Sequence, residues 1–126
     1  MIIKQLSVFI ENKEGRMLDI TRVLKDNDIN IKTLSLADTT EYGMIRLIVS
    51  DPEKAKAVLK EEGFPVSITD VIAVKADDRV GFLHDMLQKM DSAVSNIEYM
   101  YTLPGDDGVP VVIMKVSNPE EVDALL

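Results

Sequence analysis

Residues 15–31 read GRMLDITRVLKDNDINI, and residues 81–97 read GFLHDMLQKMDSAVSNI. Both stretches have a glycine at the start, an aspartate four residues later and Asn-Ile at the end. Between these positions, apolar residues recur at the three- and four-residue spacing of an amphipathic helix, and a strand-like segment follows. The repeat indicates that the chain is an internal duplication of one supersecondary unit.

The segments around the first stretch predict four strands. Residues 4–10 alternate apolar and polar side chains, which is typical of a half-buried strand. Residues 29–36 and 44–49 predict the two strands of a hairpin, and residues 66–74 predict another strand. With one helix after the first strand and another after the hairpin, the order is strand, helix, strand, strand, helix, strand. This order predicts an α+β fold of the ferredoxin-like type, an antiparallel sheet with two helices on one face.

The start of the second helix has a clear signal in Asp51-Pro52-Glu53. Aspartate can cap the helix, proline is tolerated in the first turn, and glutamate is favourable at the positive end of the helix dipole. Gly63 predicts the end of this helix. In the second copy Asn118 replaces Asp51, and we expect it to cap the equivalent helix.

The duplication predicts two units, residues 1–69 and residues 70–126. Residues 65–75 leave no room for a flexible linker, so the last strand of the first unit should continue into the first strand of the second. The chain stops at Leu126, inside the second helix of the second unit, which therefore lacks its last strand. Either the chain is truncated or a partner chain covers the open strand edge.

The composition argues against several classes of function. There are 22 acidic and 14 basic residues, and this acidic surface is unfavourable for nucleic acid and for an anionic membrane. The absence of cysteine excludes disulfides, thiolate metal sites and a cysteine nucleophile. No signal peptide or membrane span is predicted, so we expect a cytoplasmic protein. With a single histidine, binding or regulation is favoured over catalysis.

The loop between the first strand and the first helix is the most prominent repeated feature outside the predicted core. It reads NKEGRM at residues 12–17 and DRVGFL at residues 78–83. The N–H groups at a helix N-terminus can receive a carboxylate or a phosphate, and a glycine there lets a ligand approach the backbone. Asn12 and Asp78 can accept hydrogen bonds from an ammonium group. A purely structural alternative is that the glycine closes a turn and the Asn or Asp caps the helix.

A βαββαβ unit with an Asn/Asp-x-x-Gly loop before its first helix, and with Ile29-Asn30-Ile31 at its second strand, resembles the ACT domain. The resemblance recurs in the second copy, as in stand-alone tandem ACT proteins; Glu14 and Val80 stand where the family usually has proline. It implies a regulatory, non-catalytic, cofactor-free protein that binds an amino acid between the loop of one unit and the second strand of another. The implied site residues are Asn12, Glu14, Gly15, Arg16, Met17, Asn30, Ile31, Asp78, Val80, Gly81, Phe82, Leu83, Asn96 and Ile97. A regulated protein partner and a homodimer are implied as well.

Two other functions stay open at this point. The chain could be a ligand-free structural or oligomerisation module, in line with its missing strand. Arg16 and Asn30 superficially match the arginine and asparagine of a small acylphosphatase-like hydrolase, although no phosphate-binding loop is present. His84 is interpreted as a surface residue. The acidic pairs at residues 77–78 and 106–107 lack the spacing of a calcium loop, and Asp106-Asp107-Gly108 predicts a tight turn.

Overall fold

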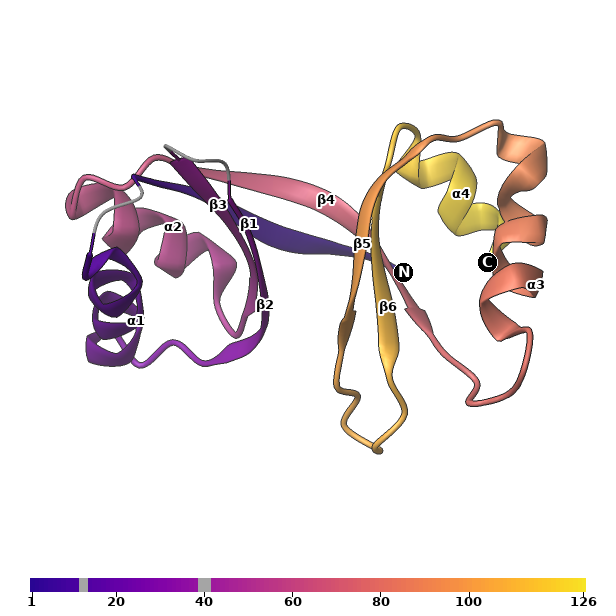
Figure 1. The fold of residues 1–126 in the computed structure, drawn as a ribbon, viewed down its shortest axis with the longest axis horizontal. Helices are drawn as coiled ribbons and strands as arrows, with labels where there is room; N and C mark the ends of the chain where they lie inside the picture. Colours follow the sequence, from indigo (N-terminus) through magenta and orange to yellow (C-terminus); the bar gives the residue numbers. More distant parts are fainter. Residues whose placement is uncertain (12–13, 39–41) are drawn as a thin grey trace. The chain divides into compact units, whose positions relative to one another are not determined.

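The computed structural model describes residues 1–11, 14–38 and 42–126 of the chain. These residues form two compact units (Figure 1). One consists of residues 4–69, and we call it the N-terminal unit. The other consists of residues 70–126 together with residues 1–3, and we call it the C-terminal unit.

The N-terminal unit has the predicted order of elements. They are β1 (Ile2–Glu11), α1 (Arg16–Asp26), β2 (Ile31–Asp38), β3 (Tyr42–Val49), α2 (Pro52–Glu61) and β4 (Val66–Lys75). The strands lie in the order β2-β3-β1-β4, and β3 is antiparallel to both β1 and β2. In Figure 1, α1 and α2 lie on the same side of these strands. The ferredoxin-like α+β prediction is confirmed.

The amphipathic pattern explains why α1 packs where it does. Its apolar positions Ile20, Val23 and Leu24 are buried, and they join a core that includes Leu6 of β1 and Leu47 of β3. Because these residues recur every three or four positions, one side of the helix closes the core and the other faces water.

The predicted signals at the ends of α2 are also confirmed. The side chain of Asp51 accepts a hydrogen bond from the backbone N–H of Lys54 at 3.2 Å, and Pro52 occupies the first turn. After the helix, Gly63 has φ = +87°, a left-handed conformation that favours glycine.

The C-terminal unit repeats the pattern with elements that follow β4. They are α3 (Phe82–Met90), a short 3₁₀ turn (Asp91–Ala93), β5 (Ile97–Leu103), β6 (Val111–Val116) and α4 (Pro119–Leu125). Antiparallel β6 lies between β4 and β5. Its core contains three methionines, Met86, Met90 and Met114.

The last strand position of the C-terminal unit is occupied by the beginning of the same chain. Met1 and Ala73 exchange both backbone hydrogen bonds, at 2.8 and 3.1 Å, as in an antiparallel pair. The Met1 ammonium group also forms an ion pair with Asp123 of α4, and Ile2 packs against the core. The sequence predicted truncation or a partner chain at this edge of β4; pairing with the first residues of the same chain was not predicted.

The expectation for Asn118 was wrong. Its side chain makes no capping bond to α4. The Nδ2 group donates instead to the carbonyl of Ala93 at 3.2 Å and to the carboxylate of Glu121 at 2.7 Å. An amide group can donate as well as accept, and here its donor side is used to hold the 3₁₀ turn.

The turn interpretation of residues 106–108 is confirmed. Asp107 Oδ1 accepts a hydrogen bond from the N–H of Val109 at 3.1 Å, and Gly108 has φ = +79°. The Lys75 ammonium lies 3.3 Å from Asp107 Oδ2. Among the residues that the structure describes, no group of three or more His, Asp or Glu side chains could hold a metal ion.

The contacts of Asp107 with Val109 and Lys75 lead to a prediction about the pKa of Asp107. The hydrogen bond from the Val109 N–H is the main cause that holds the pKa of Asp107 below its ordinary value, and the hydrogen bond from the Lys75 ammonium is the second. A carboxyl whose pKa is lower in the folded than in the unfolded protein stabilises the fold at pH values above its unfolded pKa. This contribution is lost as the pH falls through the folded pKa. We expect Lys75→Met to raise the pKa of Asp107 without restoring its ordinary value, because the Val109 bond remains. A carboxyl-carbon NMR titration measures this, and an unchanged pKa would show that Lys75 has no role.

The described part of the chain contains no helix long and apolar enough to cross a membrane. The cytoplasmic location expected from the sequence stays a prediction.

Candidate functional site

Both units open their first helix on a glycine in a left-handed conformation. Gly15 before α1 has φ = +85°, and Gly81 before α3 has φ = +84°. A Cβ atom at either position would meet no atom within 4 Å. The backbone angle is therefore what requires glycine at both positions, and the space beside each glycine is open. Among the described residues, no side chain makes a capping hydrogen bond at the N-terminus of α1 or α3.

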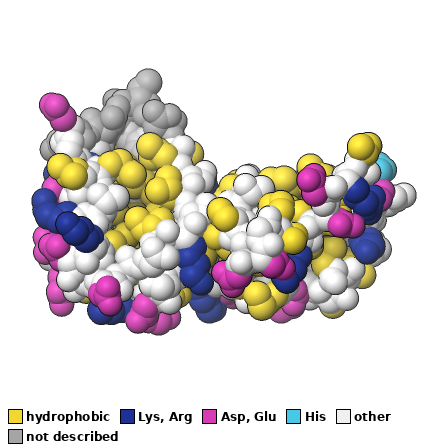
Figure 2. Space-filling model, turned by 90° about the horizontal axis from the view of Figure 1, so that it is seen from below, with side chains coloured by type: hydrophobic (Ala, Val, Ile, Leu, Met, Phe, Trp, Pro, Cys, Tyr) yellow, Lys and Arg dark blue, Asp and Glu magenta, His cyan; other side chains and the backbone are white. Residues whose placement is uncertain are grey.

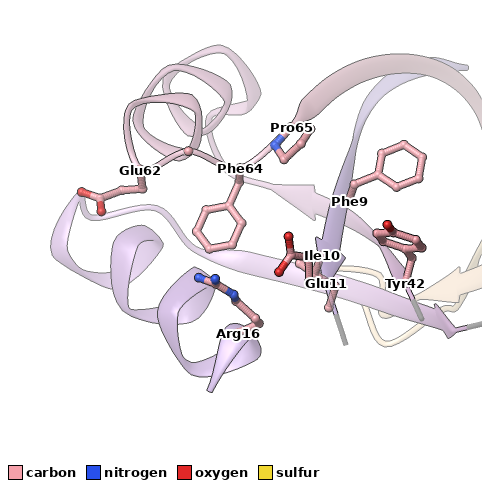
Figure 3. A pocket seen from close by; sticks show the side chains of 9 residues that line it. Phe9, Ile10, Glu11, Arg16, Tyr42, Glu62, Phe64 and Pro65 are labelled. Carbon is pink, nitrogen blue, oxygen red and sulfur yellow. The ribbon is translucent and has the colours of Figure 1, made fainter. Parts of the chain in front are cut away.

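A cavity of about 460 Å³ lies in the N-terminal unit beside the start of α1. Its walls come from the end of β1, the first residue of α1, the first residue of β3 and the segment between α2 and β4. The lining residues are Phe9, Ile10, Glu11, Arg16, Tyr42, Glu62, Gly63, Phe64 and Pro65 (Figure 3). Its volume lies in the range of about 300–1,000 Å³ that is usual for small-molecule sites.

Opposite charges are present in this cavity. Figure 3 shows the Arg16 guanidinium directed toward the Phe64 ring, with the Glu11 carboxylate on the adjoining strand. Arg16 Nη1 lies 3.7 Å from Asp19 Oδ2, which is too long for a hydrogen bond. A guanidinium has five N–H donors, so Arg16 has donors to offer to a carboxylate. Glu11 can accept hydrogen bonds from an ammonium group.

The remaining walls are mostly apolar. Phe64 and Ile10 are buried, whereas the residues Phe9 and Tyr42 are 53% and 56% exposed. The N–H of Phe9 donates to the carbonyl of Pro65 at 3.1 Å, which holds β1 against the segment of residues 62–65. The cavity therefore combines a cation, an anion and aromatic surface.

The corresponding loop of the C-terminal unit is arranged differently. Arg79 donates from Nη1 to Asp85 Oδ2 at 2.9 Å and lies 3.4 Å from Asp77 Oδ2. Its guanidinium also lies over the ring of Phe82, 5.8 Å from the ring centre. A smaller cavity of about 320 Å³ borders Arg79 and Phe82. The loop arginine is thus already held by residues of its own unit.

The predicted loop residues have different positions. In the N-terminal unit, Arg16 lines the cavity, and Gly15 is the residue before Arg16. Glu14 is exposed, and Met17 packs against the core. Asn12 lies outside the described residues. In the C-terminal unit Phe82 packs against the core, and the exposed residues are Asp78, Val80, Gly81 and Leu83.

The predicted strand residues lie at the other end of the first helix within each unit. Arg16 is the first residue of α1, whose 11 residues span about 16 Å, whereas Asn30 and Ile31 follow the end of this helix. The backbone N–H of Asn30 donates a hydrogen bond to Ser50 Oγ at 2.9 Å. In the second copy, the backbone N–H of Asn96 donates to Ser117 Oγ at 3.1 Å, and Ile97 follows Asn96. These repeated asparagines therefore fasten the hairpin inside each unit. That they face the loop of another unit stays a prediction.

Several cavity residues escaped the sequence analysis. Phe9 is a large aromatic residue at an outward position of an alternating strand, which was a usable signal. Glu11 and Tyr42 become neighbours only through the pairing of β1 with β3. The segment of residues 62–65 reaches the site only because β4 pairs beside β1.

The comparison with known families is decisive for the fold family. The profile of the family described as "ACT domain pair" matches residues 1–126. The chain belongs to this family. A solved structure of a protein from Bacteroides thetaiotaomicron is 38% identical to this ACT domain pair, with a TM-score of 0.91. That match covers 100% of this chain and 87% of the other. No protein of curated function matches the chain by sequence.

More distant structures share the fold of the ACT domain pair. The ligand-free regulatory subunit of aspartate kinase from Thermus thermophilus is 14% identical, with a TM-score of 0.68, and the match covers 99% of this chain and 94% of that one. E. coli aspartokinase III, solved in complex with lysine and aspartate, is 10% identical with a TM-score of 0.53. That match covers 98% of this chain and 30% of the enzyme.

Proposed function

We propose that this ACT domain pair is a non-catalytic regulatory protein that binds a small amino acid and thereby modulates a protein partner allosterically. The observation that carries the proposal is the presence of Arg16 and Glu11 among the lining residues of one cavity beside the start of α1. A free amino acid carries one carboxylate and one ammonium group, and these two side chains have the complementary charges.

Family membership supports the regulatory part of the proposal. The aspartate kinase subunit with the same fold is itself described as regulatory, and the aspartokinase III structure contains amino acids. The hydrolase alternative loses its basis, because Arg16 and Asn30 lie at opposite ends of α1 within the unit.

A thermal-shift screen against the twenty amino acids tests the proposal. A ligand at 100 times its dissociation constant adds about 2.7 kcal/mol of stability. We therefore expect one amino acid, or a few related ones, to raise Tm by several degrees. If no amino acid raises Tm, the binding function is contradicted.

A second candidate, homodimer formation, is favoured by the edge strand β2. Leu34 and Leu36 are 43% and 50% exposed on this strand, which ends the strand order of its unit. Figure 2 shows hydrophobic side chains gathered in a hollow on the N-terminal unit, at the left. Light scattering is expected to give a dimer mass that Leu36→Glu lowers to that of the monomer; a monomeric parent protein would contradict this candidate.

A further inference from the structure

The connection between α3 and β5 has a backbone conformation that does not suit its residue. Val94 has φ = +48° and ψ = +44°, which is left-handed, and this residue is 90% exposed. A left-handed conformation brings Cβ too close to the following carbonyl oxygen, so a β-branched residue is strained there. At the same place in the first copy, Asp28 also has a positive φ, of +58°, but aspartate tolerates this region. Both units turn through a left-handed residue here, and in the C-terminal unit this residue is strained.

The residue that follows adds to the mismatch. In the N-terminal unit Ile29 follows Asp28 and is only 5% exposed, as part of the core. In the C-terminal unit this position holds Ser95, which is half-buried and whose hydroxyl lies 3.2 Å from Ser117 Oγ. The C-terminal unit therefore exposes a valine and half-buries a serine, the reverse of the order in the N-terminal unit. Backbone strain combined with such a local conflict is typical of a segment with two competing arrangements.

Asn118 holds this strained turn from the start of α4. Its Nδ2 group donates to the carbonyl of Ala93 at 3.2 Å, and its side chain makes no capping bond to α4. In the N-terminal unit the equivalent residue, Asp51, caps α2 instead. The amide of Asn118 is thus used to hold the turn, and the first turn of α4 is left without a side-chain cap.

We propose that residues 91–95 and Asn118 form a two-state switch in the C-terminal unit. In the first state, which we call latched, Asn118 holds the carbonyl of Ala93 and Val94 is exposed. In the second state, which we call released, Val94 leaves the left-handed region and packs in the place that Ile29 has in the N-terminal unit. Asn118 then turns its Oδ1 atom to the first N–H groups of α4 and caps this helix. This inference goes beyond the proposed function and does not depend on amino-acid binding.

Opposing contributions act on the two states. Release relieves the strain at Val94, buries its apolar side chain and lets Asn118 cap α4. Latching keeps the hydrogen bond from Asn118 to Ala93. It also keeps the contact between the hydroxyls of Ser95 and Ser117. Because single hydrogen bonds, caps and strained residues contribute free energies of similar size, both states are populated.

The switch sets how the two helices of the C-terminal unit are joined. Ala93 ends the 3₁₀ turn after α3, and Asn118 immediately precedes α4, so their bond ties the two helices together at this end. Release removes this tie. A molecule that binds one state better than the other shifts the equilibrium by its difference in affinity. The N-terminal unit has Asp28 in the turn and a capped α2, so we expect no such switch there.

NMR relaxation dispersion on the amide-labelled full chain tests the switch, because this method detects exchange between states in microseconds to milliseconds. We expect residues 91–97 and residues 117–121 to exchange with one common rate. The equivalent residues of the N-terminal unit, 25–31 and 50–54, should give flat profiles. Flat profiles at residues 91–97, or different rates in the two exchanging segments, would overturn the proposal.

A matched pair of variants tests the strain. Val94→Asn places a residue in the turn that tolerates the left-handed region and adds no charge. We expect Val94→Asn to raise Tm by several degrees and to abolish the exchange at residues 91–97. The matched variant Asp28→Val should lower Tm and leave the exchange of the C-terminal unit as it is. If Val94→Asn leaves Tm and the exchange unchanged, the valine is not the strained element and the switch is refuted.

Asn118→Asp tests the latch. A carboxylate can cap α4 but cannot donate a hydrogen bond to the carbonyl of Ala93, so this variant favours the released state. We expect the amide shifts of residues 91–97 to move toward those of the minor state that the dispersion profiles of the parent protein define. The control Asp51→Asn keeps a capping side chain on α2 and should leave these shifts unchanged. Shifts that stay at their parent positions in Asn118→Asp would show that Asn118 is not the latch, and the proposal would fail.

Discussion

Arg16→Ala is expected to bind the amino acid that raises Tm in the thermal-shift screen about 30-fold more weakly than the parent protein, because a hydrogen bond to a charged group contributes about 2 kcal/mol. Arg16 lines the cavity, and its guanidinium is the group that would hold the α-carboxylate. Calorimetric titration of both proteins at the same salt concentration measures the loss. Because the interaction is between charges, the loss should shrink as the salt concentration rises.

The control is Arg22→Ala on the same helix. Both arginines lie near Asp19, at 3.7 Å for Arg16 and 3.1 Å for Arg22, and both are at least partly exposed. Surface ion pairs of this kind contribute between about 0 and 1 kcal/mol, so the two variants should be similarly stable. Only Arg16→Ala should lose affinity. An equal loss in both variants would mean that the effect comes from α1 as a whole and not from the cavity.

The second large effect is on stability and concerns Ile2. This residue comes at the start of β1, yet it packs against the core of the C-terminal unit. We expect Ile2→Asp to destabilise that unit by about 2 kcal/mol, since a charge would replace a partly buried apolar side chain. Hydrogen exchange should show lost protection in α3 and β6, with protection in α1 and α2 retained.

Ile68 of β4 provides the reciprocal variant, because it packs against the core of the N-terminal unit. Ile68→Asp should reduce protection in α1 and β3 and leave α3 and β6 protected. If Ile2→Asp instead reduced protection in the N-terminal unit, the assignment of residues 1–3 to the C-terminal unit would be wrong.

The sequence predicts local structure well because local structure depends on neighbours along the chain. The spacing of Ile20, Val23 and Leu24 predicts a helix face, and Asp51 caps α2 through a residue only three positions away. Each of these signals needs only a few consecutive residues. The tandem ACT fold follows from their order and repetition.

Contacts between distant residues were not predictable in the same way. Met1 pairs with Ala73, 72 residues away, and Asn118 bonds to Ala93, 25 residues away. Both contacts depend on how finished elements pack. The same is true of the cavity, where Glu11 and residues 62–65 meet only after β1 and β4 have paired. The loop signal around Gly15 could therefore point to the site but not to its far walls.

The most direct test of the central claim, that the cavity of the N-terminal unit binds an amino acid, is an NMR titration of the amide-labelled chain with the amino acid that raises Tm. Binding in the cavity predicts shift changes centred on the lining residues 9–11, 16 and 62–65 that saturate together. Shift changes that centre on residues 77–89, or a spectrum that does not change with any amino acid, would contradict the claim.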